Sequence, residues 1–274
     1  MDLHVSIRPE TLFEIGPIQF TNSFLTMILV MVGLVLVGNW VARSATMVPT
    51  HGQSIFEMTA EFILSLVEGA AGKEVGRRIF PLIGSLFIFI IIANYAGLLP
   101  GVGTIGKYEA EDEDHARVAA VAAFQEHSEE DGHGETLIPY FRSPSADLNM
   151  TLAMSVFVVL IVQAAGIMAH GIGGRIKHMA DPWWIFPLEL VGELARIVSL
   201  AFRLFGNIFA GEVLVAVMVA FGAATYFVLT PFTTVFLYLE VLFGFVQALV
   251  FALLSLIYLA LATAGGHGSE DHAH

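Results

Sequence analysis

The sequence predicts an all-α polytopic membrane protein with five or so transmembrane helices. Hydrophobic residues make up 56% of the 274 residues and charged residues only 14%, whereas soluble domains carry about 25% charged residues. Several apolar runs reach the roughly 20 residues that a helix needs to cross the hydrocarbon core of a bilayer. The polar residues inside such runs are concentrated in the last third of the chain.

Three apolar runs have the length of a single crossing: residues 21–42, 79–99 and 148–169. A fourth stretch, residues 184–264, is apolar nearly throughout and is interrupted by a short uncharged turn around residues 222–231. With a rise of about 1.5 Å per residue, each half is longer than a layer about 30 Å thick requires. We therefore predict that the two halves form a long, strongly tilted antiparallel hairpin.

Residues 53–76 lie between the first two spans and have the pattern of an amphipathic helix. Apolar residues such as Ile55, Phe62 and Ile63 recur at helical spacing, and Glu57 falls on the other side. This pattern predicts a helix on the membrane surface, and a helix packed on other protein is the open alternative. No part of the chain has the alternation of a strand, and no internal repeat is evident.

The orientation follows from basic residues in short loops, which favour the cytoplasm. Such residues follow the first and third spans: Arg43, Lys73, Arg77, Arg78, Arg175 and Lys177. We therefore expect the N-terminus and an acidic loop, residues 101–146, to lie outside and the C-terminus to lie in the cytoplasm. A bacterial-type inner membrane fits this arrangement. The N-terminus lacks a basic start before an apolar run, so no signal peptide is expected.

The net charge of −13 is mostly local, because residues 109–135 hold ten acids and one arginine. Residues 107–135 are interpreted as a solvated segment, and a cation-attracting antenna or weak metal binding is the alternative. The histidine-containing tail, residues 265–274, receives the same interpretation. The chain has no cysteine, which excludes disulfides and thiolate metal sites. No glycine-rich phosphate loop is present, and we expect no cofactor, no metal, no nucleic-acid partner and no catalytic site of its own.

Polar residues inside the predicted hairpin are the candidate functional site. Ionisable side chains within a membrane span are costly and mark ion pathways by default. Glutamates with water can relay protons, but arginine stays protonated and is a barrier that attracts a carboxylate on a partner. The polar set of the hairpin is Glu189, Glu193, Arg196, Arg203, Asn207, Glu212, Glu240 and Gln247.

The hairpin geometry predicts which of these residues lie at the same depth. Residues equally far from an apex near residue 225 are level with each other, so Arg203 should lie level with Gln247. By the same rule Glu212 should lie level with Glu240, toward the outer side of the arginine. Asn207 follows Arg203 by four residues and shares its face.

Two carboxylates, Glu189 and Glu193, fall on the cytoplasmic side of Arg203. Glu193 and Arg196 are three residues apart, so a local ion pair is expected. Glu189 follows Trp184 closely and can instead be an interfacial residue. Along the hairpin the predicted order is outer carboxylates, then a deep cation, then inner carboxylates. This order suits a membrane protein in which protons leave one path and enter another.

Four segments resemble the family of subunit a of F-type ATP synthases. Residues 199–212 read SLAFRLFGNIFAGE and resemble the family signature, and residues 245–258 resemble its last helix. Residues 94–100, NYAGLLP, resemble the end of its second span, and residues 144–152, PSADLNMTL, the start of its third. The segments occur in the family's order and spacing, over roughly residues 20–263.

The resemblance implies roles for individual residues. Arg203 matches the essential arginine that faces the carboxylate of the c-ring and separates two half-channels. Asn207 and Gln247 match polar residues beside it. Glu212 and Glu240 match the pair that lines the outer half-channel. Two further residues belong to the cytoplasmic side: Glu189, which matches an acidic position there, and Glu193, which is added from its depth alone.

The resemblance also implies a function and partners. The chain would translocate protons to and from the c-ring, coupling ion flow to ATP synthesis. Its partners would be the c-ring subunits, b-type peripheral stalk subunits, the rest of the synthase and the lipid bilayer. A stand-alone proton channel or secondary transporter is the alternative, but such proteins often have inverted repeats and spread their polar residues over several helices. A purely structural anchor predicts that Arg203 is replaceable.

Overall fold

A computed structural model describes residues 9–15, 18–44, 51–99, 101–102, 105–110, 135–180, 184, 186–225 and 230–264. Within these ranges five helices are long and apolar enough to cross a membrane. The predicted class, an all-α polytopic membrane protein, is therefore confirmed. Most of the acidic loop and the histidine-containing tail lie outside the described residues, so their interpretations remain predictions.

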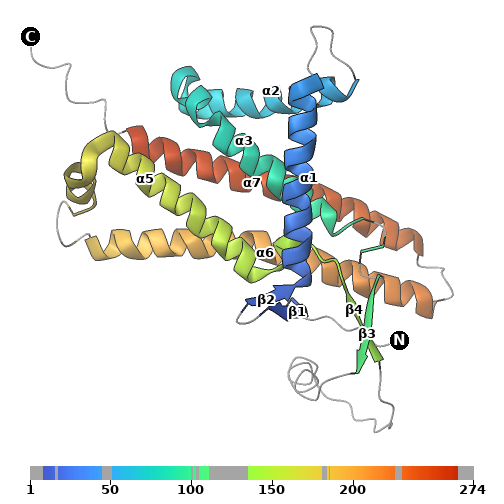
Figure 1. Ribbon diagram of the computed structural model, residues 1–274. Helices are drawn as coiled ribbons and strands as arrows, with labels where there is room; N and C mark the ends of the chain where they lie inside the picture. The colour runs from blue at the N-terminus through green and yellow to red at the C-terminus, as the bar shows by residue number, and fades with distance from the viewer. Residues whose placement is uncertain are drawn as a thin grey trace, which may run out of the picture.

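The five long helices occupy the predicted apolar runs. Their bounds are α1 Asn22–Ser44, α3 Lys73–Ala96, α5 Leu148–Ala180, α6 Phe186–Ala224 and α7 Thr230–Ala264. The helix α5 extends beyond its predicted span and is kinked at Gly171, whose φ of 72° lies in the left-handed region that glycine tolerates. In Figure 1, α6 and α7 run side by side and cross α1 steeply. The tilt of this pair relative to the bilayer normal stays a prediction.

The amphipathic segment forms a separate helix, α2, His51–Ala71. Gly72, with a φ of 78°, makes the corner after it, so the last residues of the predicted segment 53–76 belong to α3. Ile63 and Val67 of α2 are buried in the common core, whereas Ile55 is exposed. One apolar face of α2 thus packs on protein and another is uncovered. Its place on the membrane surface stays a prediction.

The expectation of no strands was wrong for two short hairpins. Both are two-stranded and antiparallel and lie in the lower part of Figure 1, pairing β1 Thr11–Ile15 with β2 Ile18–Thr21 and β3 Gly106–Ala110 with β4 Glu135–Pro139. In the first hairpin, Phe13 stacks on Phe20 across the strands, with ring centroids 4.8 Å apart. Such a cross-strand pair stabilises strands that are too short for alternation to stand out in the sequence.

The core lies where α3, α5, α6 and α7 meet. It contains Ile83 and Ile90 from α3, Leu204 from α6, and Phe251 and Leu256 from α7. All five side chains are almost completely buried. This packing fixes α6 against α7, which matters because the candidate polar residues lie on these two helices.

Two hydrogen bonds join the end of α3 to α7. The side-chain amide of Asn94 donates to the Gly244 carbonyl at 3.0 Å, and the Tyr95 hydroxyl donates to the Val241 carbonyl at 3.0 Å. The helices come close here, because a Cβ added to Gly244 would lie 3.2 Å from the Tyr95 ring. Asn94 and Tyr95 therefore join the end of α3 to α7.

The segment before α5 is anchored in the same region. The hydroxyl of Ser143 donates to the Ala93 carbonyl at 3.1 Å, and Gly97 is so close that an added Cβ would lie 2.7 Å from Cβ of Ser143. A short 3₁₀ helix, η1 (Pro144–Ala146), follows, and Asp147 then accepts the Asn149 backbone N–H at 2.9 Å. This last contact is an N-cap of α5.

Candidate functional site

Arg203 lies on an uncovered face of α6. Its side chain is exposed, as are those of Phe202 and Asn207, whereas Leu200 and Leu204 point into the core. Among the residues that the structure describes, none makes a hydrogen bond or an ion pair with Arg203. The guanidinium is therefore presented outward from the protein rather than into the hairpin.

Asn207 and Gln247 link the two helices beside this arginine. The Asn207 side-chain amide donates to Oε1 of Gln247 at 2.7 Å. Gln247 is buried, and its Nε2 has no hydrogen-bond partner within the described part of the chain. The structure thus brings Gln247 to Asn207, one helical turn from Arg203, close to the level that the hairpin geometry predicts.

Glu212 and Glu240 approach each other further along the hairpin. Glu240 is buried, and its carboxylate lies so near α6 that a Cβ added to Gly211 would be 2.7 Å from Oε1. The two carboxylates interact electrostatically. Oε2 of Glu240 has no hydrogen-bond partner among the described residues. The structure therefore brings Glu212 and Glu240 near each other, as expected for residues that lie at the same level of the hairpin.

Arg142 is a further member of this layer, which the sequence patterns did not predict. Its Nε donates to Oε2 of Glu212 at 3.2 Å, and its side chain is only 12% exposed. The guanidinium also lies over the Phe209 ring, 5.9 Å from the centroid. Arg142 falls within residues 101–146, the segment that was expected to be an external loop. One sequence feature could have indicated a buried position for Arg142: the aromatic residues Tyr140 and Phe141 directly precede it.

A second arginine cluster lies on the other side of Arg203. Arg196 donates to Oε1 of Glu193 at 2.9 Å, as expected from their spacing, and lies 4.5 Å over the Tyr258 ring. Glu193 is buried, and its Oε2 has no partner in the described ranges. Glu189 is half-buried in the first turn of α6. The structure does not join Glu189 and Glu193 by any contact that would define a path.

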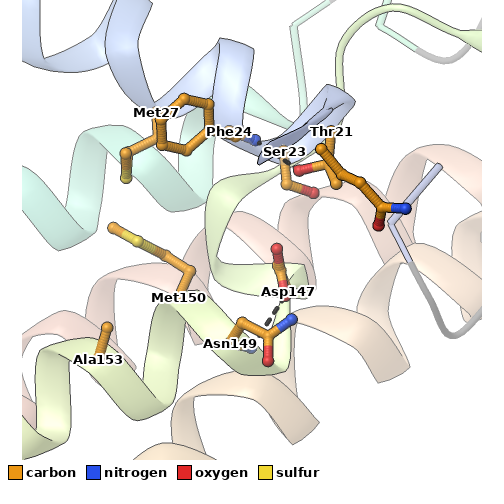
Figure 2. Close-up of a pocket in the computed structure, with 9 residues that line it drawn as sticks. Thr21, Ser23, Phe24, Met27, Asp147, Asn149, Met150 and Ala153 are labelled. Carbon is orange, nitrogen blue, oxygen red and sulfur yellow. Dashed lines mark hydrogen bonds between the residues drawn. The ribbon is translucent and has the colours of Figure 1, made fainter. Parts of the chain in front are cut away.

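A cavity of about 340 Å³ lies between the starts of α1 and α5 (Figure 2). Phe24, Met27 and Met150 line one side, and Asp147 and Asn149 lie on the other. Burial raises the pKa of the Asp147 carboxyl above its ordinary value, partly offset by the Asn149 N–H and by Arg142. Within the described ranges, no group of three or more side chains has the composition of a metal site.

The arrangement has a definite charge order along the hairpin. A paired Arg142–Glu212 layer with buried Glu240 lies at one end, exposed Arg203 in the middle, and the Glu193–Arg196 pair at the other end. Carboxylates with unsatisfied oxygens can accept and return protons, whereas a guanidinium cannot release one at physiological pH. The arrangement therefore has carboxylates on both sides of Arg203, whose charge is permanent.

Comparisons with known proteins agree on one family. The family model described as ATP synthase A chain matches residues 24–260. The chain is similar to ATP synthase subunit a of Moorella thermoacetica, with 32% identity over 93% of this chain and 96% of the relative. It is also similar to ATP synthase subunit a of Syntrophobacter fumaroxidans, with 33% identity over 100% of this chain and 94% of the relative.

Proposed function

Because this chain belongs to the subunit a family of F-type ATP synthases, we propose that it exchanges protons with a c-ring through two offset half-channels. The family membership makes it an integral membrane subunit of the F-type ATP synthase complex, which translocates protons. The nucleotide chemistry then belongs to other subunits. A bacterial inner membrane and b-type stalk partners are part of the same proposal.

The outward position of Arg203 carries the proposal. An arginine without a counter-charge in the hydrocarbon region costs at least about 2.5–3.5 kcal/mol. Arg203 is exposed and has no ion-pair partner in the part of the chain that the structure describes. A carboxylate on a neighbouring subunit offsets this cost, and in the proposed assembly each c-subunit presents one in turn.

The outer half-channel would end at Glu212 and Glu240. A proton that reaches this pair passes to a c-ring carboxylate, which loses its attraction to Arg203 and turns into the lipid. Buried Glu240 supports this role, because one of its oxygens lacks a partner in the described residues and can accept a proton. Arg203 blocks a direct leak because a second cation is repelled by the guanidinium.

The inner half-channel would pass Glu189 and Glu193. After nearly a full rotation, the c-ring carboxylate releases its proton on this side. Asn207 and Gln247 hold α6 and α7 together between the two paths through their 2.7 Å hydrogen bond. We assign Glu193 a secondary place, because its Oε1 is already occupied by Arg196.

The test is ATP-driven proton pumping in inverted membrane vesicles, with Arg203→Ala compared with Arg196→Ala and wild type. We expect Arg203→Ala to abolish pumping while the complex still assembles. Arg196→Ala should keep pumping at a reduced rate, because it leaves the buried Glu193 carboxylate without its cation but keeps Arg203 in place. Normal pumping by assembled Arg203→Ala would overturn the proposal. Failure to co-purify with a small two-helix ring subunit would instead indicate a stand-alone transporter.

A further inference from the structure

Arg142 lies outside the long helices but reaches into the hairpin. It falls between β4 and η1, and its backbone N–H donates to the Thr26 hydroxyl of α1 at 3.3 Å. The next residue, Ser143, is anchored to the Ala93 carbonyl of α3 at 3.1 Å. Two helices therefore fix the backbone from which the Arg142 side chain extends.

The guanidinium of Arg142 interacts with two carboxylates, one on α6 and one just before α5. It contacts Glu212 on α6 at 3.2 Å and interacts electrostatically with Asp147 at the start of α5. It also lies over Phe209, which stacks on Phe205 with centroids 5.3 Å apart. Removing one partner of a buried ion pair leaves an uncompensated charge, so these groups depend on one another.

The direction of the Glu212 carboxylate follows from these contacts. Oε2 is held by Arg142, and the backbone N–H of Ser143 lies beside the same carboxylate. Glu240 approaches from α7, close to Gly211. A proton relay needs donor and acceptor within hydrogen-bond reach or one water apart. A carboxylate free to rotate away from Glu240 would break such a relay.

We propose that Arg142 is a positioning residue of the outer proton path, which holds the Glu212 carboxylate beside Glu240. The inference rests on the proposed role of Glu212 and Glu240. It adds a third element to the path, because Arg142 belongs to the external segment before α5. The cation acts through Glu212 and need not contact the moving proton.

The experiment measures ATP-driven pumping and the amount of assembled complex for Arg142→Gln, Arg142→Lys and Glu212→Gln. The control is Arg77→Gln, since Arg77 forms a 2.8 Å pair with Glu68 far from the hairpin site. We expect Arg142→Gln to slow pumping about 10- to 100-fold, the size of effect that a ~1 Å misplacement of a reacting group has. Arg142→Lys should fall between this variant and wild type, because lysine keeps the charge without the planar fork.

Each outcome has a defined meaning. Wild-type pumping by assembled Arg142→Gln overturns the positioning role, as does equal loss in the lysine and glutamine variants. If Arg142→Gln does not assemble, the lysine variant decides: slowed pumping supports positioning, and wild-type pumping leaves a structural role only. Normal pumping by Glu212→Gln shows that the proposed path is wrong, and the positioning role fails with it.

Discussion

Three arginines near the hairpin have different surroundings, and the surroundings separate their roles. Arg142 is paired with Glu212, and Arg196 is paired with Glu193 and stacked on Tyr258. Arg203 is exposed and makes no such contact with the residues that the structure describes. Arg142 and Arg196 thus have ion-pair partners within this chain, whereas Arg203 has none among the described residues. This difference is consistent with the proposal that Arg203 faces the c-ring.

Gly211→Ala tests whether the close approach of Glu240 to α6 matters for pumping. An added Cβ would lie 2.7 Å from Oε1 of Glu240, which must move. The carboxylate end of a side chain can shift at low cost, so the complex should assemble. We expect slower ATP-driven pumping, by about 10-fold or more if Glu240 moves by ~1 Å.

The control for this variant is Gly33→Ala on α1, where an added Cβ meets nothing within 4 Å. Alanine favours helix over glycine by roughly 1 kcal/mol, so the control should assemble and pump normally. Unchanged pumping in Gly211→Ala would mean that Glu240 tolerates displacement and is not a fixed part of the relay.

The relative depth of Glu212 and Glu240 could be predicted from the sequence for a geometric reason. Glu212 and Glu240 belong to one hairpin with a short turn, so their distances from the apex fix their relative depth. Arg142 is 70 residues from Glu212, and no local rule connects them. Its contact depends on how the segment before α5 packs on α1 and α3, and such tertiary packing is not encoded in periodicity or spacing.

At the scale of elements, the close contact between α3 and α7 can be tested by overpacking it. Gly244→Val would place side-chain atoms against the Tyr95 ring, which an added Cβ alone already approaches to 3.2 Å. The helices must separate, which breaks the Asn94 and Tyr95 hydrogen bonds. Overpacking costs typically 1–3 kcal/mol, and each lost bond adds about 0.5–1.5 kcal/mol.

We expect Gly244→Val to reduce the amount of assembled complex, measured by native gel after detergent extraction. Gly38→Val on α1 is the matched control, since nothing lies within 4 Å of an added Cβ there. Equal assembly of the two variants would contradict a tight joint between α3 and α7.

The N-cap of α5 gives a pH-dependent prediction. Burial raises the pKa of Asp147 above its ordinary 3.8, so the folded state holds this proton more tightly than the unfolded state does. Stability is therefore lost as pH rises through the window between the ordinary value and the raised one. Asparagine caps helices as well as aspartate does, so Asp147→Asn should be at least as stable as wild type at pH 7.

Thermal aggregation of the subunit in the detergent-solubilised complex, followed from pH 4 to 8, measures this effect. Asp147→Ala loses the cap and should be destabilised by about 0.5–2 kcal/mol. If Asp147→Asn is as unstable as Asp147→Ala at pH 7, the charge of Asp147 is itself required, and burial is not the dominant effect.

The elements themselves differed in how well the sequence predicted them. Long apolar runs are reliable because the bilayer thickness sets a minimum length, and all five crossings are present by length and composition. The predicted end of the amphipathic helix was a few residues too late. Both α2 and α3 are helical, and only the left-handed φ of 78° at Gly72 marks the boundary between them. The two hairpins were missed because strands of four or five residues carry little periodic signal.

At the scale of the molecule, the two ends of the structure differ in composition. The strands and the starts of α1 and α5 lie toward the lower end of Figure 1, and α2 with the start of α3 lies at the upper end. Arg43 lies in the last turn of α1, and Lys73, Arg77 and Arg78 lie near the start of α3, so basic residues gather at the upper end. The positive-inside rule therefore predicts that this end faces the cytoplasm.

Single-cysteine labelling tests this orientation directly, because the chain contains no cysteine of its own. Thr11 and Ile105 are exposed near the strands, and Glu74 is exposed at the start of α3. A membrane-impermeant maleimide should label Thr11→Cys and Ile105→Cys in intact spheroplasts, and Glu74→Cys only after permeabilisation.

The reverse labelling pattern would change the assignment of the two proton paths as well as the orientation of the chain. The layer of Glu212, Glu240 and Arg142 lies toward the strand end, because Arg142 follows β4 and hydrogen-bonds to Thr26 near the start of α1. Labelling of Glu74→Cys from outside would therefore place this layer on the cytoplasmic path and Glu193 on the outer one. Labelling in the predicted sense, with all three variants still pumping, ties the buried Glu240 to the outer path, because the layer that contains it lies toward the strand end, which the reagent then reaches from outside.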